Sequence, residues 1–212
     1  MIEISKTMLD SLRGEIACAM SPKRLRHTLA VESMTERLCA LFCPEATTWM
    51  RAAALLHDCT KELGTAEQEA LCRTYGLTVT PLDLLAPKTL HARTAAACIP
   101  SRYPAFDCAE IRDAVRWHTT GRADMTLYEK LLYLADYIDD SRSFENCVLL
   151  RRYFWGAAPE RMERAELDAL LCDTLILSFD MTMRDLLAEG TPIAPDTVAA
   201  RNALLLERQA RR

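Results

Sequence analysis

Residues 127–140 read LYEKLLYLADYIDD. Apolar side chains occupy nearly all sides of this segment, which predicts a buried helix with Asp136 inside it. Thr126 and Glu129 form the capping-box pattern that begins such a helix. An ionised carboxylate at position 136 is costly to bury unless it meets a cation or several hydrogen-bond donors. A bound metal would remove that cost, whereas the alternative is an aspartate paired with an arginine or capping another helix.

The chain on either side of this segment has the same helical character. Its 212 residues include only six glycines and nine prolines, and apolar residues recur at intervals of three and four rather than alternating. We therefore expect an all-α protein. The predicted helices run from 22 to near 44, and over about 48–62, 64–76, 90–98, 107–118, 127–140, 159–188 and from 195 onward. The stretch from the end of the helix over 64–76 up to residue 88 is expected to be irregular.

The domain organisation follows from the short connections between these helices. No internal repeat or low-complexity segment is visible, so we expect a single domain over residues 1–212. Its core is expected to span about 21–150, with additional C-terminal helices over about 151–212 packed on it.

Composition excludes several classes of protein. The chain has 26 Lys and Arg residues against 30 Asp and Glu, a net charge of -4, which argues against nucleic-acid binding but leaves room for a local basic pocket. Nine cysteines without a Cys-x-x-Cys pair indicate reduced thiols. Neither a signal peptide nor a membrane span of about 18 uncharged apolar residues is visible. We expect a cytoplasmic protein that binds neither nucleic acid nor membrane.

The four histidines carry the chemical signal. His27, His57, His91 and His118 each lie on or beside an apolar helical stretch. One such histidine is more often a hydrogen-bonded core residue than a ligand, but four together with Asp136 favour a metal site. His57 and Asp58 end the apolar run AALL, so two kinds of metal ligand stand side by side at one helix end.

The order of these residues resembles the metal-binding pattern of the HD-domain phosphohydrolases, which are all-helical enzymes, in their extended two-metal form. More narrowly, six blocks resemble the YqeK-like branch, which hydrolyses symmetrical dinucleoside tetraphosphates. The blocks are SPKRLRHTLAVE (21–32), AALLHDCTKE (53–62), TLHARTAA (89–96), VRWHTTG (115–121), LYLADYIDDSR (132–142) and APDTVAARNALL (194–205).

The resemblance implies a ligand set. It places His27, His57, Asp58 and Asp136 around one divalent metal ion. It places Asp58, His91 and His118 around a second ion, so that Asp58 bridges the two. Imidazole and carboxylate ligands suit iron, manganese or zinc, and the resemblance favours iron. The implied activity is the cleavage of diadenosine tetraphosphate to two ADP molecules by a metal-bridging hydroxide.

Further residues are candidates for holding the phosphates. Lys61 lies three residues beyond Asp58, where its ammonium group could reach bound phosphate; the alternative is a solvated lysine. Hydroxyls and flexible backbone after His118 could bind phosphate or form a plain turn. This group consists of Thr119, Thr120 and Gly121. Arg24 and Arg142 could hold the more distant phosphates by forked hydrogen bonds or serve as surface ion-pair partners.

Two other functions stay open at this point. An HD-type nucleotidase or phosphodiesterase could use the same metals on another nucleotide. A non-catalytic nucleotide-binding module could keep the helical bundle, although the complete ligand set argues against it. The expected partner is a dinucleoside polyphosphate or another nucleotide, and a homodimer is an open alternative.

Overall fold

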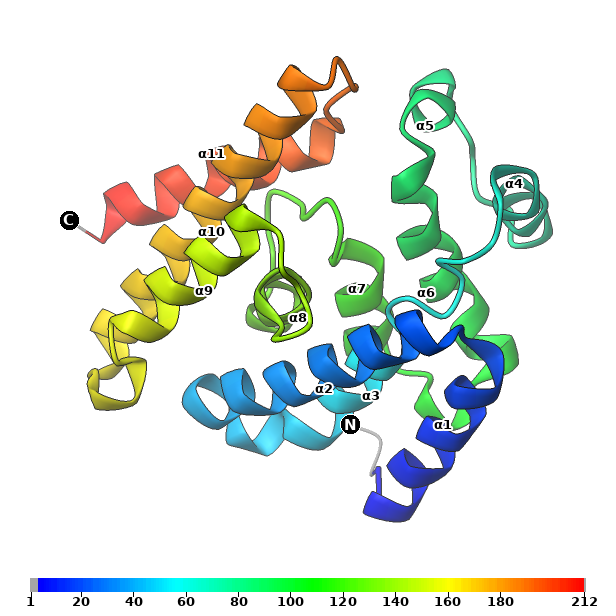
Figure 1. The fold of residues 1–212 in the computed structure, drawn as a ribbon, viewed down its shortest axis with the longest axis horizontal. Helices are drawn as coiled ribbons and strands as arrows, with labels where there is room; N and C mark the ends of the chain where they lie inside the picture. The colour runs from blue at the N-terminus through cyan, green and yellow to red at the C-terminus, as the bar shows by residue number, and fades with distance from the viewer. Residues whose placement is uncertain (1–3, 212) are drawn as a thin grey trace.

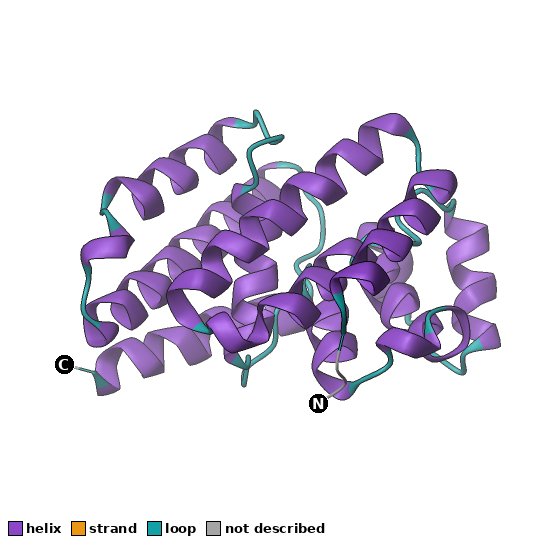
Figure 2. Cartoon of the chain, turned by 90° about the horizontal axis from the view of Figure 1, so that it is seen from below, coloured by secondary structure: helices purple, strands orange, loops and turns teal. Residues whose placement is uncertain are grey.

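The protein is described by a computed structural model that covers residues 4–211 (Figure 1). These residues form eleven α-helices and no strand, as the sequence predicts (Figure 2). The helices are α1 (Lys6–Ala19), α2 (Pro22–Phe42), α3 (Thr47–Leu56), α4 (Thr65–Thr74), α5 (Pro81–Leu85), α6 (Leu90–Arg102), α7 (Ala109–Trp117), α8 (Leu127–Ile138), α9 (Glu145–Gly156), α10 (Arg164–Ala188) and α11 (Pro195–Ala210).

Helix α8 lies at the centre of the fold. It contacts α2, α3, α7, α9 and α10, and Figure 1 shows it between the C-terminal helices and the rest of the molecule. Leu131, Leu132 and Leu134 are fully buried, which confirms the predicted buried helix. Thr126 caps its first turn by accepting a hydrogen bond from the Glu129 N–H at 3.3 Å. The central position of α8 places Asp136 among several helices.

Helices α2 and α3 pack side by side, but α3 is shorter than predicted. Ser21 caps α2, and that helix matches its predicted span. The predicted helix over 48–62 ends at Leu56, and residues 57–63 form successive turns. The Thr60 carbonyl accepts a hydrogen bond from the Gln68 side chain at 2.6 Å, and the Thr60 hydroxyl binds the His91 carbonyl at 3.0 Å. These bonds compete with helical bonding and hold the turns in place.

The region from α4 to α7 differs from prediction in two places. Helix α5 lies inside the stretch that we expected to be irregular, because Thr80 and Asp83 form a capping box ahead of it. Helix α6 continues through Pro100 to Arg102 rather than ending near 98.

Two helices lie outside the predicted set. Helix α1 buries Leu9, Leu12 and Ile16, spaced by three and four, and packs on α3. Helix α9 buries Cys147, Leu150 and Phe154 at the same spacing and packs on α10. The helix predicted over 159–188 begins at residue 164, because Pro159 starts a separate 3₁₀ turn. The last helix begins at Pro195 as predicted.

The buried apolar residues form one continuous cluster from α1 to α11. The four histidines lie on or directly after α2, α3, α6 and α7, and each of these helices contributes to that cluster. Within residues 4–211, none of the helices combines the length and the apolar character needed to cross a lipid bilayer.

Candidate metal centre

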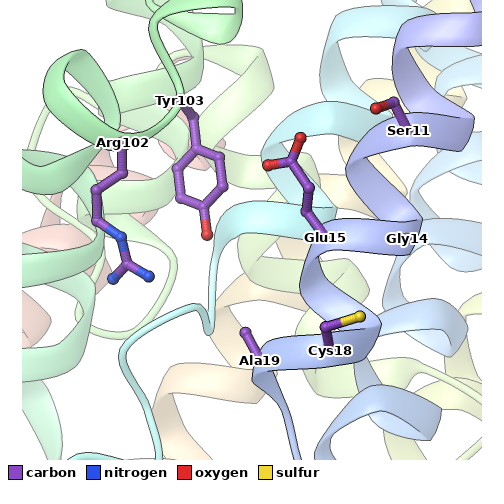
Figure 3. Close-up of a pocket in the computed structure, with 7 residues that line it drawn as sticks. All are labelled: Ser11, Gly14, Glu15, Cys18, Ala19, Arg102 and Tyr103. Atoms are coloured by element: carbon purple, nitrogen blue, oxygen red, sulfur yellow. The ribbon is translucent and has the colours of Figure 1, made fainter.

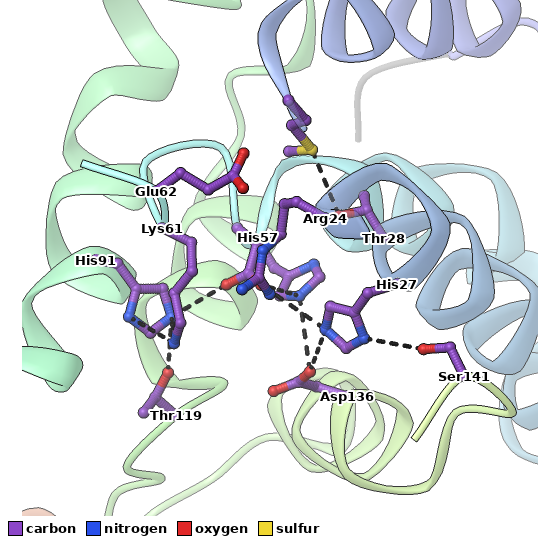
Figure 4. Close-up of polar contacts among 12 residues, drawn as sticks. Arg24, His27, Thr28, His57, Lys61, Glu62, His91, Thr119, Asp136 and Ser141 are labelled. Atoms are coloured by element: carbon purple, nitrogen blue, oxygen red, sulfur yellow. Dashed lines mark hydrogen bonds and ion pairs between the residues drawn. The ribbon is translucent and has the colours of Figure 1, made fainter. Parts of the chain in front are cut away.

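The predicted ligands lie on or directly after five helices. Figure 4 shows four of them, His27, His57, His91 and Asp136. His27 lies on α2 and Asp136 on α8, while His57 and His118 immediately follow α3 and α7. His91 is the second residue of α6. His57, His91 and His118 are almost completely buried. Residues that are 109 positions apart in the sequence therefore face one another inside the protein.

Three of the histidines are oriented by the same local hydrogen bond. In each, Nδ1 faces the backbone carbonyl of the residue three positions earlier. The distances are 2.6 Å for His57 to Ala54, 2.7 Å for His91 to Lys88 and 2.7 Å for His118 to Val115. Because a carbonyl only accepts, Nδ1 carries the proton and the Nε2 lone pair is free to bind a cation. Such second-layer bonds are typical of metal-binding histidines.

Asp58 lies between two pairs of histidines. Its Oδ1 is 3.2 Å from His91 Nε2 and 3.8 Å from His118 Nε2. Its Oδ2 is 3.4 Å from His57 Nε2 and 3.7 Å from His27 Nε2. Burial opposes the negative charge, but the surrounding imidazoles, His57 foremost, hold the pKa of Asp58 well below its usual range. The carboxylate therefore presents one oxygen to each pair.

Asp136 faces the His27 side of the centre. Its Oδ1 is 2.9 Å from His27 Nε2 and 3.8 Å from His57 Nε2. Burial opposes its ionisation, but Arg142 and His27 hold the pKa of Asp136 well below its usual range. Of the alternatives open from the sequence, the structure shows the aspartate paired with an arginine and also aimed at two histidines.

Asp139 belongs to this side of the centre, although the sequence analysis did not single it out. It is fully buried, and its Oδ2 lies 3.3 Å from Nδ1 of His27. Burial lowers the pKa of His27, but hydrogen bonds to Asp136 and Asp139 outweigh it and raise that pKa to about 9. A second acidic residue three positions after Asp136, at the end of an apolar helix, was the signal that could have identified it.

The donor set fits a divalent cation. Two groups could each hold a metal ion, with ligand atoms within 4.8 Å of one another: His27 with His57 and Asp136, and His57 with Asp58 and His118. Within residues 4–211, the buried Nε2 atom of His57 has no hydrogen-bond partner, as expected of a nitrogen that binds a metal. All donors are nitrogen or oxygen, which suits iron, manganese or zinc.

His91 has a cation beside it. The Lys61 ammonium lies 3.1 Å from its Nε2, which is itself 3.0 Å from His118 Nε2. Thr119 Oγ1 lies 3.2 Å from the same His91 nitrogen. Burial lowers the pKa of Lys61. The predicted Lys61 and Thr119 therefore lie at the centre.

The two predicted arginines also reach the centre. Arg24 pairs with the Asp58 carboxylate and Arg142 pairs with Asp136, so neither is a plain surface ion pair. The negative charge of Asp136 raises the pKa of Arg142. Together with Lys61, these residues place three cations around the histidines and aspartates. Figure 4 shows two of them, Lys61 and Arg24.

The other two predicted phosphate-binding residues lie farther from the histidines. Thr120 lines a separate small cavity of about 90 Å³, and its hydroxyl donates to the Gly121 carbonyl at 3.0 Å. Gly121 has a φ of 64°, and a Cβ placed on it would lie 2.7 Å from the Phe179 ring and 3.0 Å from Ala200. The structure therefore packs Gly121 against α10 and α11, which gives the absence of a side chain a steric reason.

Two larger cavities lie on different parts of the surface. One, of about 450 Å³, adjoins the centre, because His27, Arg24 and Arg142 are among its lining residues. The other, of about 650 Å³, lies between α1 and the end of α6, where Glu15, Arg102 and Tyr103 line it (Figure 3). None of the clustered histidines lines the second cavity, so of these two cavities only the first adjoins the centre.

Comparison with known proteins identifies relatives over most of the chain. The family model of the HD domain matches residues 24–140. A Bacillus subtilis protein named symmetrical bis(5'-nucleosyl)-tetraphosphatase is 30% identical over 193 residues, which cover 90% of this chain and 95% of that one. A Halalkalibacterium halodurans protein of the same name is 29% identical over 190 residues, covering 90% and 93%.

A solved structure shares the fold. The crystal structure of an "HD superfamily hydrolase involved in NAD metabolism" from Clostridium acetobutylicum superposes with a TM-score of 0.80 at 29% identity. The match covers 93% of this chain and 97% of that one.

Proposed function

The chain is a hydrolase that belongs to the HD-domain family, and from this premise we propose that it cleaves diadenosine tetraphosphate symmetrically into two ADP molecules. The observation that carries the proposal is Asp58, which presents one oxygen to each of two histidine pairs. The similarity to symmetrical tetraphosphatases over 90% of the chain supports the choice of substrate.

The proposal includes two divalent metal ions, with iron favoured over manganese and zinc. His27, His57, Asp58 and Asp136 would hold one ion, and Asp58, His91 and His118 the other. Such a pair supplies Lewis-acid activation of water and neutralises charge on the phosphoryl group. The protein's own contribution is to fix the ligand orientation, through the carbonyl bonds to His57, His91 and His118.

The three cations have a separate role in the proposal. Each phosphate of a dinucleoside tetraphosphate carries one negative charge, and the carboxylates of Asp58 and Asp136 already offset part of the charge of two divalent ions, so further positive groups are needed along the substrate. Lys61, which lies beside His91, would bind the phosphate on that side. Arg24 and Arg142 would bind phosphates on the His27 side, and their planar guanidinium groups suit forked hydrogen bonds. Thr119 adds a hydroxyl beside His91 and His118.

Chromatographic product analysis tests the reaction. We would purify the protein anaerobically, supply ferrous iron and incubate it with diadenosine tetraphosphate. ADP as the only product is expected. AMP plus ATP would keep the hydrolase but overturn the symmetrical cleavage. Intact substrate in the presence of bound metal would overturn the choice of substrate and direct the search to mononucleotides and cyclic nucleotides.

Asp58→Ala tests the metal centre. Removing the carboxylate shared by both histidine pairs should abolish binding of both ions and lower activity by more than about 100-fold, beyond the usual effect of an outer-layer residue. Elemental analysis and turnover would be measured on the same sample. Asp140→Ala is the matched control, since that carboxylate is 69% exposed and should leave both quantities unchanged. Full metal content in Asp58→Ala would contradict the assigned ligands.

A further inference from the structure

The cavity beside His27 has features that the hydrolysis of phosphates alone does not require. Its walls are the first turns of α2 and the segment 141–144 between α8 and α9. The first turns of α2 supply Lys23, Arg24 and Arg26, and the connecting segment supplies Arg142 and Phe144. Four cations and one aromatic ring therefore line a cavity of about 450 Å³ that opens onto the candidate metal centre.

Two of the cations have no internal partner. Arg24 and Arg142 pair with Asp58 and Asp136. In the part of the chain that the structure describes, neither Lys23 nor Arg26 takes part in an ion pair. Both are exposed and lie on the outer side of the cavity. Their charges are thus available to an anionic ligand that extends outward from the centre.

Phe144 is the unusual member of this set. Its side chain is 71% exposed, although it borders a strongly cationic cavity. A single exposed apolar residue is ordinary on a protein surface, so exposure alone carries no argument. The position of Phe144 carries the argument instead. An aromatic ring beside several cations matches a ligand that joins phosphates to a flat ring.

The segment that carries Phe144 is held in place from both sides. Buried Asp139 accepts a hydrogen bond from the Ser141 N–H at 2.8 Å. The Arg151 guanidinium donates to the carbonyls of Ile138 at 2.8 Å and of Arg142 at 2.9 Å. Arg142 is further fixed by Asp136. The ring is therefore presented by a braced segment, and a preorganised contact costs less conformational entropy when a ligand binds.

We propose that this cavity binds one nucleoside diphosphate half of the substrate, with its base stacked on Phe144 and its phosphates held by the surrounding cations. The inference rests on the proposed function, because cleavage at the middle of a tetraphosphate leaves two such halves on opposite sides of the metal centre. Lys61 and Thr119 lie on the His91 side, whereas this cavity lies on the His27 side. Phe144 is thus a residue that positions the base by stacking.

The test separates stacking from charge. Phe144→Ala should raise the KM for diadenosine tetraphosphate and the Kd for ADP about tenfold, within the usual worth of base stacking, and leave kcat unchanged. Phe144→Tyr should restore both constants. The Kd for inorganic tripolyphosphate, which has no base, should not change. Leu149→Ala is the matched control, since that residue is 45% exposed on the neighbouring helix and lies outside the cavity.

The outcomes also separate this inference from the proposed function. Arg26→Ala should weaken the binding of ADP and of tripolyphosphate equally, whereas Phe144→Ala should weaken only the binding of ADP. A wild-type protein that binds ADP but fails to cleave the tetraphosphate would overturn the reaction, while the ADP titrations would still decide the role of Phe144. Three outcomes would each overturn the subsite. They are an equal loss of affinity for ADP and tripolyphosphate in Phe144→Ala, unchanged ADP binding in that variant, and no ADP binding by the wild type.

Discussion

At the scale of single residues, the centre is governed by which atoms its side chains leave free. His57, His91 and His118 each use Nδ1 for a carbonyl of their own chain segment, so Nε2 is directed inward before any cation binds. The ligands are therefore oriented when the helix ends fold, and the binding of a cation does not have to orient them. Lys61 and the two arginines place positive charge beside these nitrogens and the two aspartates.

Lys61→Ala should keep the metal and slow the reaction. The ammonium lies beside His91 and is not a ligand, so its removal should lower kcat by about 100-fold, as for the loss of one charge-stabilising donor. Metal content should remain that of the wild type. Lys88→Ala is the control, because Lys88 is exposed although it is close to His91 in the sequence. A metal-free Lys61→Ala protein would contradict the role given to this residue.

His27 predicts a pH dependence for the metal-free protein. Its pKa rises from an ordinary 6.5 to about 9, so the folded protein holds this proton more tightly than the unfolded chain does. The resulting stability is fully present below pH 6.5 and is lost as the pH rises towards 9. A metal must displace the proton, so its apparent affinity should increase by about tenfold per pH unit over that interval.

Calorimetric titration of the metal in buffers of different ionisation enthalpy would count the released protons. We expect about one proton from His27 at pH 7.5. Asp139→Asn removes one of the two carboxylates that raise the His27 pKa, and should reduce this proton release. Metal affinity independent of pH between 6.5 and 9 would contradict the assignment of His27 as a ligand.

The clustered histidines and Asp136 could be predicted from residue types, but the part of the site that depends on how distant helices pack could not. Four scarce histidines and an aspartate inside an apolar helix are visible in the sequence, and the structure brings them together. Asp139 was not predicted, because its contact with His27 depends on the packing of α2 against α8. The separation of Thr119 from Thr120 and Gly121 likewise depends on α10 and α11.

At the scale of elements, the turn after α7 is fixed by a close contact. Gly121→Ala should destabilise the protein by about 2–4 kcal/mol, because a left-handed residue acquires a Cβ that overlaps Phe179. Gly190→Ala is the control: its φ of 65° is nearly the same, but no atom lies within 4 Å of the added Cβ. It should cost about 1 kcal/mol.

Urea unfolding of both variants would separate the clash from the backbone strain. The Gly121 variant should also shift Thr119, so its KM for the tetraphosphate should rise while that of the Gly190 variant does not. Equal losses of stability in the two variants would show that the contact with α10 has no energetic weight.

Helices α1 and α9 were not predicted, although their buried residues have helical spacing. Leu9, Leu12 and Ile16 are spaced as in a helix, but charged residues interrupt the apolar pattern of this segment. The end of α3 at Leu56 was not predictable from its own residues, because the Thr60 carbonyl is bound by the distant Gln68 side chain. Tertiary hydrogen bonds decided that boundary.

At the scale of the whole molecule, the C-terminal helices share a core with the centre. Phe179 of α10 is fully buried and stacks on Tyr133 of α8, with ring centroids 4.5 Å apart. Tyr133 lies one turn from Asp136 on the same helix. We therefore expect residues 151–212 to unfold together with the rest of the chain, as one domain, rather than as an appended unit.

Phe179→Ala tests this expectation. The cavity left in the shared core should lower the free energy of unfolding by about 3–5 kcal/mol and, for a chain of this size, lower Tm by about 6–20 °C. Calorimetry should show one transition, with equal calorimetric and van't Hoff enthalpies. Leu187→Ala on the same helix, 70% exposed, should change neither. Two transitions, of which only one shifts in Phe179→Ala, would show that α10 and α11 form a separate unit.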